Sequence, residues 1–371
     1  MRIQELYMRD LWSRIVINDV HFSRLNVLVG VSGAGKTTII SALKTLVRIA
    51  EGDTAAGLEW RIRFLDDTGK KITWTGKTSR KVELTPTGIG SKIVEEKLLV
   101  DEELIINNSD NEVLFNGFRL PRLDDTKSLL FHLKNEIKDI HTSLTSSIII
   151  DADSPDFSPS NNQMINRSTY SDKLNEHKKN FDIKKFSHQN RELTCKEKIY
   201  YAYEYDKEAF IDFQETYISI FEQVKEIKPR VARTMESTDS QRLLVIELEL
   251  NNGQRVGQRK ISSGMYKTMM ILAELFFGSN KSPIIIDEIE NSLGVNCLPE
   301  ILSQLNDTEN QVIITSHHPR VINEIPVKFW NIVSRKKDGS VVTYPASEVL
   351  PSGRHEAFIQ LINSPEFRGS R

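Results

Sequence analysis

Residues 30–37, Gly-Val-Ser-Gly-Ala-Gly-Lys-Thr, follow the apolar run Leu-Asn-Val-Leu-Val at residues 25–29. The run predicts a buried strand, and residues 38–43 predict the start of a helix. A loop of the pattern GxxxxGK[ST] between a strand and a helix is typical of phosphate binding, because glycines allow a tight turn that points backbone N–H groups at phosphate oxygens. A chance match would occur on the order of one time in a hundred in a chain of this length. We therefore predict a nucleoside-triphosphate site.

The polar side chains of this loop have separate expected roles. Lys36 can reach the β- and γ-phosphates as a point charge, and the hydroxyl of Thr37 can hold Mg²⁺. The helix that follows adds a dipole that favours an anion at its N-terminus. The residues expected to bind the nucleotide are Gly30, Ser32, Gly33, Ala34, Gly35, Lys36, Thr37 and Thr38.

Two acids follow an apolar run at residues 283–288, Pro-Ile-Ile-Ile-Asp-Glu. A carboxylate at the tip of the strand beside the loop strand can hold the water shell of Mg²⁺, which suits Asp287. The neighbouring carboxylate, Glu288, can polarise the attacking water. The alternative is an ordinary acidic turn after a core strand. The upstream loop favours the catalytic interpretation.

Residues 311–319, Gln-Val-Ile-Ile-Thr-Ser-His-His-Pro, predict another buried strand, which ends in two histidines. Ligands bind at the carboxyl edge of open α/β sheets, so a histidine there could contact the γ-phosphate or the water. We favour His317 over His318, with a surface histidine as the alternative.

A helix is expected over residues 263–277, and small residues precede it. Ser262 and Gly264 at the N-terminus of this helix could bind an anion. Taken alone, the segment is also an ordinary helix start.

The order of these four segments resembles that of the ABC-type ATPases. The similar branch contains SMC proteins, RecF, the OLD-family ATPases and stand-alone bacterial defence ATPases of the AAA type. The resemblance covers residues 1–50 and about 242–325. The family signature is LSGGQ, and this chain has Ile-Ser-Ser-Gly-Met at residues 261–265, which departs from it at Ser263 and Met265.

The resemblance also assigns two further family segments. It places residues 290–293 at the D-loop and His317 at the switch histidine. The Q-loop is not located; Glu95 or Glu96 is a candidate, and an exposed strand end is the favoured interpretation of both.

The resemblance implies that this chain binds ATP and Mg²⁺ and hydrolyses ATP to ADP and phosphate. Thr37 and Asp287 would hold the metal, and Glu288 and His317 would be catalytic. The loop of one copy would hold ATP, while Ser262 and Gly264 of a second copy close over the γ-phosphate. The expected assembly is a homodimer or a higher homo-oligomer formed through ATP.

The patterns predict an α/β fold, namely a P-loop NTPase with an ABC-type head and a helical insertion. Short alternating runs over residues 58–116 favour an antiparallel β region, and a βα-like series after residue 263 favours a parallel one, so the sheet should be mixed. We expect an N-terminal ATPase lobe (1–125), a mostly helical insertion or lid (126–240), a C-terminal ATPase lobe (241–350) and a tail (351–371).

The amino-acid composition limits the classes of protein to which this chain can belong. The chain has 371 residues, of which 39% are hydrophobic and 27% are charged, and its formal net charge is −2. This balance predicts a globular protein without global attraction to nucleic acid or to a membrane. We find no apolar core of a signal peptide and no apolar run near the roughly 18 residues of a membrane span, so we expect a cytoplasmic protein. Cys195 and Cys297 form no CxxC pair, and we expect reduced thiols.

Three functions remain open at this stage. The first is an ATPase that senses a trigger and regulates a separate effector, a nuclease or a toxin, in anti-phage defence. The second is a RecF-like repair ATPase that binds DNA. The third is a scaffold that uses ATP to oligomerise. A lysine-rich run at residues 173–198 could touch nucleic acid, but it also contains four acidic residues, so we favour a solvated helix face.

Overall fold

The computed structural model describes residues 1–85, 88–109, 112–121, 123–150, 155–166, 181–232, 241–291, 293, 297–318, 321, 324–351 and 353–363. The chain divides into two compact units. The first comprises Met1–Ile149, Lys281–Glu288 and Asn310–Arg371, and the second comprises Ile150–Asn280 and Ile289–Glu309.

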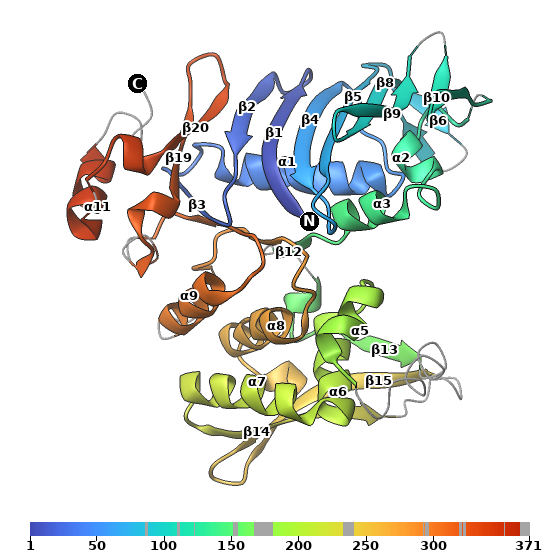
Figure 1. The fold of residues 1–371 in the computed structure, drawn as a ribbon. Coiled ribbons are helices and arrows are strands. Elements are labelled where there is room, and N and C mark those ends of the chain that lie inside the picture. The colour runs from blue at the N-terminus through green and yellow to red at the C-terminus, as the bar shows by residue number, and fades with distance from the viewer. Residues whose placement is uncertain are drawn as a thin grey trace. The chain divides into compact units, whose positions relative to one another are not determined.

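The first unit is built on one sheet, which has fourteen strands within the described residues (Figure 1). In sheet order these strands are β11 (Phe118–Arg119), β10 (Val113–Phe115), β9 (Glu103–Asn108), β8 (Ile93–Val100), β5 (Lys71–Thr78), β4 (Leu58–Leu65), β1 (Arg2–Asp10), β2 (Ile15–His21), β20 (Val341–Pro345), β19 (Trp330–Arg335), β3 (Leu25–Val29), β18 (Val312–Ser316), β17 (Ile284–Ile286) and β12 (Ile148–Ile150).

The sheet is mixed, as the sequence predicts. Strands β19, β3, β18 and β17 pair in parallel, whereas the strands from β11 to β2 pair antiparallel. Every residue of β3 and β18 is buried, which is typical of parallel strands covered on both faces. Buried and more exposed residues alternate along β4 and β5, as expected for strands with only one fully covered face. The predicted α/β fold is confirmed.

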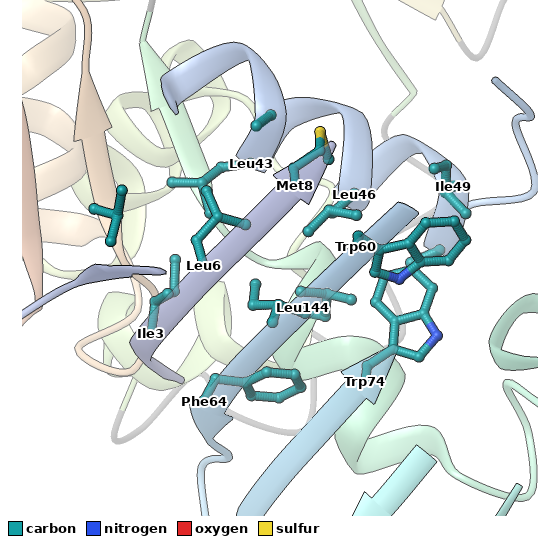
Figure 2. Close-up of a cluster of buried hydrophobic side chains, with 14 of the residues drawn as sticks. Ile3, Leu6, Met8, Leu43, Leu46, Ile49, Trp60, Phe64, Trp74 and Leu144 are labelled. Atoms are coloured by element: carbon teal, nitrogen blue, oxygen red, sulfur yellow. The ribbon is translucent and has the colours of Figure 1, made fainter. Parts of the chain in front are cut away.

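The core of the first unit lies between this sheet and α1 (Lys36–Ala50), with α2 (Leu129–His132) and α3 (Lys138–Thr145) contributing buried side chains. Figure 2 shows Leu43, Leu46 and Ile49 of α1 packed over the side chains of β1 and β4. Leu43 and Leu46 lie three residues apart, and Ile49 lies three further on, so they share one helix face. The apolar stripe on α1 therefore fixes the helix that follows the glycine-rich loop against the sheet.

Glu96 is buried in β8 and is 1% exposed, so its interpretation as an exposed strand end is wrong. Its carboxylate accepts hydrogen bonds from Trp74 Nε1 at 2.9 Å, Ser128 Oγ at 2.5 Å and the backbone N–H of Leu129 at 2.7 Å. Burial raises the pKa of Glu96, although these hydrogen bonds oppose the rise. Glu96 thus connects β5, β8 and the start of α2, while its neighbour Glu95 is exposed.

The second unit combines a small antiparallel sheet with helices. The strands are β13 (Gln163–Asn166), β15 (Gln241–Leu250), β14 (Val224–Ala232) and β16 (Arg255–Gly257). The helices are α5 (Ile183–Gln189), α6 (Cys195–Tyr205), α7 (Lys207–Ile220), α8 (Ser263–Phe277) and α9 (Leu298–Asp307). Helices expected between residues 126 and 233 are present, but this segment also contributes β13 and β14.

The remaining described elements are short or lie near the C-terminus. They are β6 (Glu83–Thr85), β7 (Gly88–Gly90), α11 (Arg354–Asn363) and the 3₁₀ turns η1 (Pro155–Phe157), η2 (Gln258–Lys260), η3 (Val327–Phe329) and η4 (Ala346–Glu348). Within the described residues, no helix combines the length and the apolar composition that a membrane span requires.

The C-terminal end of the lysine-rich run is buried, so the expected solvated face is wrong there. Lys198 Nζ donates to both carboxylate oxygens of Glu274 in α8, at 2.8 and 2.7 Å. Lys196 Nζ donates to the carbonyl oxygen of Asn161 at 2.8 Å, and burial lowers the pKa of Lys196 to about 8. A buried charge needs a partner, and Glu274 supplies one from a distant part of the sequence. Residues 173–180 of the run lie outside the described residues.

Glu96→Ala tests the role of the buried carboxylate in the fold. The substitution leaves three buried donors without an acceptor, and each such donor costs about 1–3 kcal/mol. We expect the free energy of unfolding to fall by about 3 kcal/mol in urea denaturation followed by tryptophan fluorescence. The matched control is Glu95→Ala, an exposed neighbour on the same strand, with an expected change below about 0.5 kcal/mol. Equal losses in the two variants would contradict the assignment.

Candidate nucleotide-binding site

The glycine-rich loop joins β3 to α1, and glycine is required at its different positions for different structural reasons. Gly33 and Gly35 have φ values of 81° and 110°, a left-handed conformation that favours glycine. A Cβ atom at Gly30 would lie 2.6 Å from the carbonyl oxygen of Val333, and one at Gly35 would lie 2.6 Å from a methyl group of Val341. The loop therefore lies close against β19 and β20, and larger residues at these two positions would displace it.

Lys36 is 6% exposed and curls back over the loop. Its Nζ donates hydrogen bonds to the carbonyl oxygens of Gly30 at 2.8 Å and Val31 at 3.1 Å. Ala34 N–H donates to the same carbonyl of Val31, at 3.1 Å, so the loop closes on itself. The ammonium group is thus held beside the backbone that the motif predicts to surround phosphate.

The parallel strands carry the predicted acids to the loop, although not in the expected order. Asp287 follows β17, and β18 lies between β17 and β3, so the expectation that Asp287 lies beside the loop strand is wrong. Asp287 nevertheless reaches across, because its Oδ1 lies 3.5 Å from Oγ1 of Thr37. The carboxyl ends of β3, β17 and β18 meet at one edge of the sheet.

The oxygen atoms at this edge fit a magnesium ion. Mg²⁺ prefers oxygen ligands at about 2.1 Å, so two oxygens 3.5 Å apart, on Thr37 and Asp287, can both contact one ion. The glycine-rich loop likewise fits phosphate, with the ammonium of Lys36 held beside it. The donor set therefore suits a magnesium nucleotide.

Thr315 also belongs to this site, although it is not among the residues predicted from the sequence. Its Oγ1 donates to Asp287 Oδ1 at 2.5 Å and accepts from the backbone N–H of Glu288 at 2.7 Å. Glu288 itself has a φ of 46°, in the left-handed region that few non-glycine residues adopt. The feature of the sequence that could have identified Thr315 is a hydroxyl residue that follows the apolar residues of β18.

The two histidines lie at the same edge. His317 follows the last residue of β18 and is exposed, while the backbone N–H of His318 donates to Ser316 Oγ at 3.0 Å. Parallel pairing of β18 with β3 brings the end of β18 to the side where the loop begins. A contact between His317 and a phosphate stays a prediction.

The signature segment lies in the second unit. Ser262 is exposed at the N-cap of α8, and its Oγ accepts a hydrogen bond from the N–H of Met265 at 3.3 Å. Gly264 lies in the first turn of α8. Lys267, also on α8, donates from Nζ to the carbonyl oxygen of Asn291 at 2.8 Å, which ties the helix to the predicted D-loop. Ser292 of that loop lies outside the described residues.

A cavity of about 310 Å³ adjoins α1, the helix that contains the end of the phosphate-binding loop motif. It lies between the β1–β2 connection, which supplies Trp12 and Ser13, and the face of α1 that carries Thr38 and Ser41. Trp12 is 65% exposed there, and Thr38 directly follows the last residue of the loop motif. An exposed indole beside a phosphate site offers a flat surface on which a nucleotide base can stack. Trp12 is not among the residues predicted from the sequence, although a tryptophan in a polar turn could have pointed to it.

Comparisons with known proteins identify a family for this chain. Residues 25–323 match the protein family described as "AAA domain, putative AbiEii toxin, Type IV TA system". That range contains the glycine-rich loop, the signature segment, Asp287, Glu288 and His317. A search of curated proteins by sequence found no match.

The structure is similar to solved structures of SMC heads. The SMC head bound to the C-winged helix domain of ScpA has a TM-score of 0.52 at 14% identity, over 93% of this chain and 98% of that chain. The SMC head domain from Thermotoga maritima has a TM-score of 0.42 at 13% identity, over 93% and 99% of the chains. The Smc head with an extended coiled coil, derived from Pyrococcus furiosus and bound to the C-terminal domain of ScpA, has a TM-score of 0.47 at 13% identity, over 98% and 100%.

The likeness to the first of these heads shows the fold, and the family match covers most of the sequence. The recognition of an ABC-type, SMC-like ATPase head is therefore confirmed. This chain belongs to the AAA-domain family of AbiEii type and has the P-loop fold of an ABC-type ATPase head.

Proposed function

We propose that this chain binds ATP with Mg²⁺ and hydrolyses it to ADP and phosphate. The observation that carries the proposal is the meeting of the phosphate-binding loop with the acids at one sheet edge, where Thr37 Oγ1 and Asp287 Oδ1 lie 3.5 Å apart. Glu288 follows Asp287 directly, so a carboxylate able to orient a water molecule stands next to the metal position.

Each residue at this edge has a role in the proposal. The loop N–H groups and Lys36 bind the phosphates, Thr37 and Asp287 hold the metal, and Glu288 accepts a proton from the attacking water. His317 contacts the γ-phosphate. When bound, Mg²⁺ supplies positive charge that stabilises the charge on the transferring phosphoryl group.

A second copy of the chain completes the site in this proposal. Ser262 is exposed at the start of α8, where the backbone N–H groups and the helix dipole favour an anion. In a two-fold dimer, Ser262 and Gly264 of each copy face the phosphates bound by the other, which gives two equivalent sites. ATP then links the copies, and hydrolysis removes the link.

The output of this cycle is proposed to be the control of a separate effector in antiviral defence. A toxin–antitoxin system has two components, so the family description supports the existence of a partner chain. The similar SMC head is bound to a domain of ScpA, which shows that a head of this fold can carry another protein. A ligand that favours the dimer would shift the population bound to the effector.

Lys36→Ala tests the nucleotide site. Removing the ammonium group should weaken the binding of a fluorescent ATP analogue about 100-fold or more, because charged hydrogen bonds to phosphate are lost. The matched control is Lys44→Ala, which removes an exposed lysine from the same helix and should change the affinity less than about twofold. Tight binding by Lys36→Ala would reject the site.

Glu288→Gln tests whether ATP joins copies of the chain. The amide cannot accept the proton, so ATP should persist and the dimer should accumulate. We expect light scattering to give a dimeric mass for Glu288→Gln with Mg²⁺ and ATP, and a monomeric mass with ADP. No change of mass in either the wild type or the variant would contradict an ATP-linked dimer.

Mixing two inactive variants tests whether each site draws on two copies. Lys36→Ala removes the phosphate-binding lysine of the loop, and Ser262→Arg prevents the signature segment from binding phosphate. A mixed dimer nevertheless contains one intact site, formed by the loop of one variant and the signature segment of the other. An equal mixture should regain about one quarter of the wild-type ATPase rate, because half of the dimers are mixed and each has one intact site of two. Activity no greater than that of either variant alone would show that the site does not form between copies.

A further inference from the structure

The hydroxyl group of Thr315 touches both acidic positions of the site. Thr315 is 0% exposed, and its neighbours earlier in β18 are apolar. β18 pairs with β3 on one side, where Thr315 lies opposite Leu28, and with β17 on the other, where the last pair is Ile314 with Ile286. The next position on each strand places Thr315 beside Asp287.

The hydrogen bonds of this hydroxyl have a single consistent arrangement. A threonine hydroxyl has one proton to donate and lone pairs that accept. The proton goes to Asp287 Oδ1 at 2.5 Å, and a lone pair accepts the backbone N–H of Glu288 at 2.7 Å. The donor and acceptor roles in these two bonds cannot be reversed, because a carboxylate cannot donate a hydrogen bond and an N–H cannot accept one. Thr315 therefore fixes the orientation of the Asp287 carboxylate and the position of the Glu288 backbone together.

The second of these bonds holds an unfavourable backbone conformation. Glu288 has a φ of 46°, and non-glycine residues in that region persist only where the surroundings hold them. The torsion φ sets the direction of the Glu288 side chain relative to its own N–H, and Thr315 is the acceptor of that N–H. The direction in which the Glu288 carboxylate leaves the chain thus depends on the Thr315 hydroxyl.

We propose that Thr315 is a positioning residue for ATP hydrolysis. It holds the metal-binding carboxylate of Asp287 and the water-activating carboxylate of Glu288 in one geometry. It also ties both of them to β18, the strand that His317 directly follows. The inference rests on the proposed function, since it assigns Thr315 a task in the same reaction. Groups that orient metal ligands commonly matter about 10- to 100-fold for metal affinity or activity.

The experiment compares Thr315→Val, which removes the hydroxyl at nearly constant shape, with Thr315→Ser, which keeps it. The measurements are kcat and KM for ATP hydrolysis, and the affinity for a fluorescent ATP analogue at a series of Mg²⁺ concentrations and in EDTA. We expect Thr315→Val to lower kcat about 10- to 100-fold and to raise the Mg²⁺ concentration for half-maximal binding about tenfold. Affinity in EDTA should change less than about twofold, and Thr315→Ser should stay within about threefold of the wild type.

Thr268→Val is the matched control. Thr268 is also fully buried, but its hydroxyl has no hydrogen-bond partner in the part of the chain that the structure describes. The same substitution there should leave kcat and the Mg²⁺ dependence unchanged. Thermal unfolding of all variants reports any loss of folding. If Thr315→Val does not fold, Thr315→Ala removes the same hydroxyl and takes its place.

Two results would overturn the inference while leaving the proposed function intact. One is a Thr315→Val protein with wild-type kcat and Mg²⁺ dependence. The other is a Thr315→Ser protein that loses as much as Thr315→Val, because the hydroxyl would then not be the group that matters. A wild-type protein that neither binds nor hydrolyses ATP would instead reject the proposed function, and the inference with it.

Discussion

The parallel pairing of β3, β18 and β17 is the constraint on which the site depends. Backbone hydrogen bonds align the three strands so that their carboxyl ends lie at one edge. The phosphate-binding loop and Asp287 are about 250 positions apart in the sequence, yet this pairing leaves a hydroxyl and a carboxylate oxygen 3.5 Å from each other. The side chains of these three strands are buried on both faces of the sheet, so the strands are held within the core.

Several parts of this arrangement follow from the sequence because they depend on local patterns. The three strands are short apolar runs, and the loop between β3 and α1 is a motif whose glycines are demanded by backbone conformation or close contact. The helix α8 starts and ends where its pattern predicts. The residues of one element and its adjoining loop are enough to predict each of these features.

Other parts depend on partners that are distant in the sequence, and local patterns did not find them. The strand order that separates Asp287 from the loop strand is an example. Lys198 is buried because Glu274, in another helix, neutralises it. Glu96 shares a strand face with the buried Leu98, so a strict period of two would have placed it inside. Thr315 was passed over because a single hydroxyl in an apolar strand is usually a tolerated exception.

The capping hydrogen bond of Ser262 shows how one residue can both cap a helix and bind a phosphate. In the described structure the Ser262 oxygen accepts a hydrogen bond from Met265 N–H, which uses a lone pair. The proton of the hydroxyl is not consumed by that bond, so it stays available to an oxygen of a phosphate. The start of α8 can therefore remain capped while it binds an anion.

The position of β3 in the sheet has a consequence for synthesis on the ribosome. Both neighbours of β3, namely β18 and β19, come from residues 312–335, whereas β3 ends at Val29. At about 5–20 residues per second, roughly 15–60 s pass between the translation of this strand and that of its second neighbour. During that interval both edges of a strand whose residues are all buried in the folded protein lack their native partners, and such edges are prone to aggregate. The phosphate-binding loop is thus translated early but gains its supporting strands among the last, and the nascent chain depends on other protection until then.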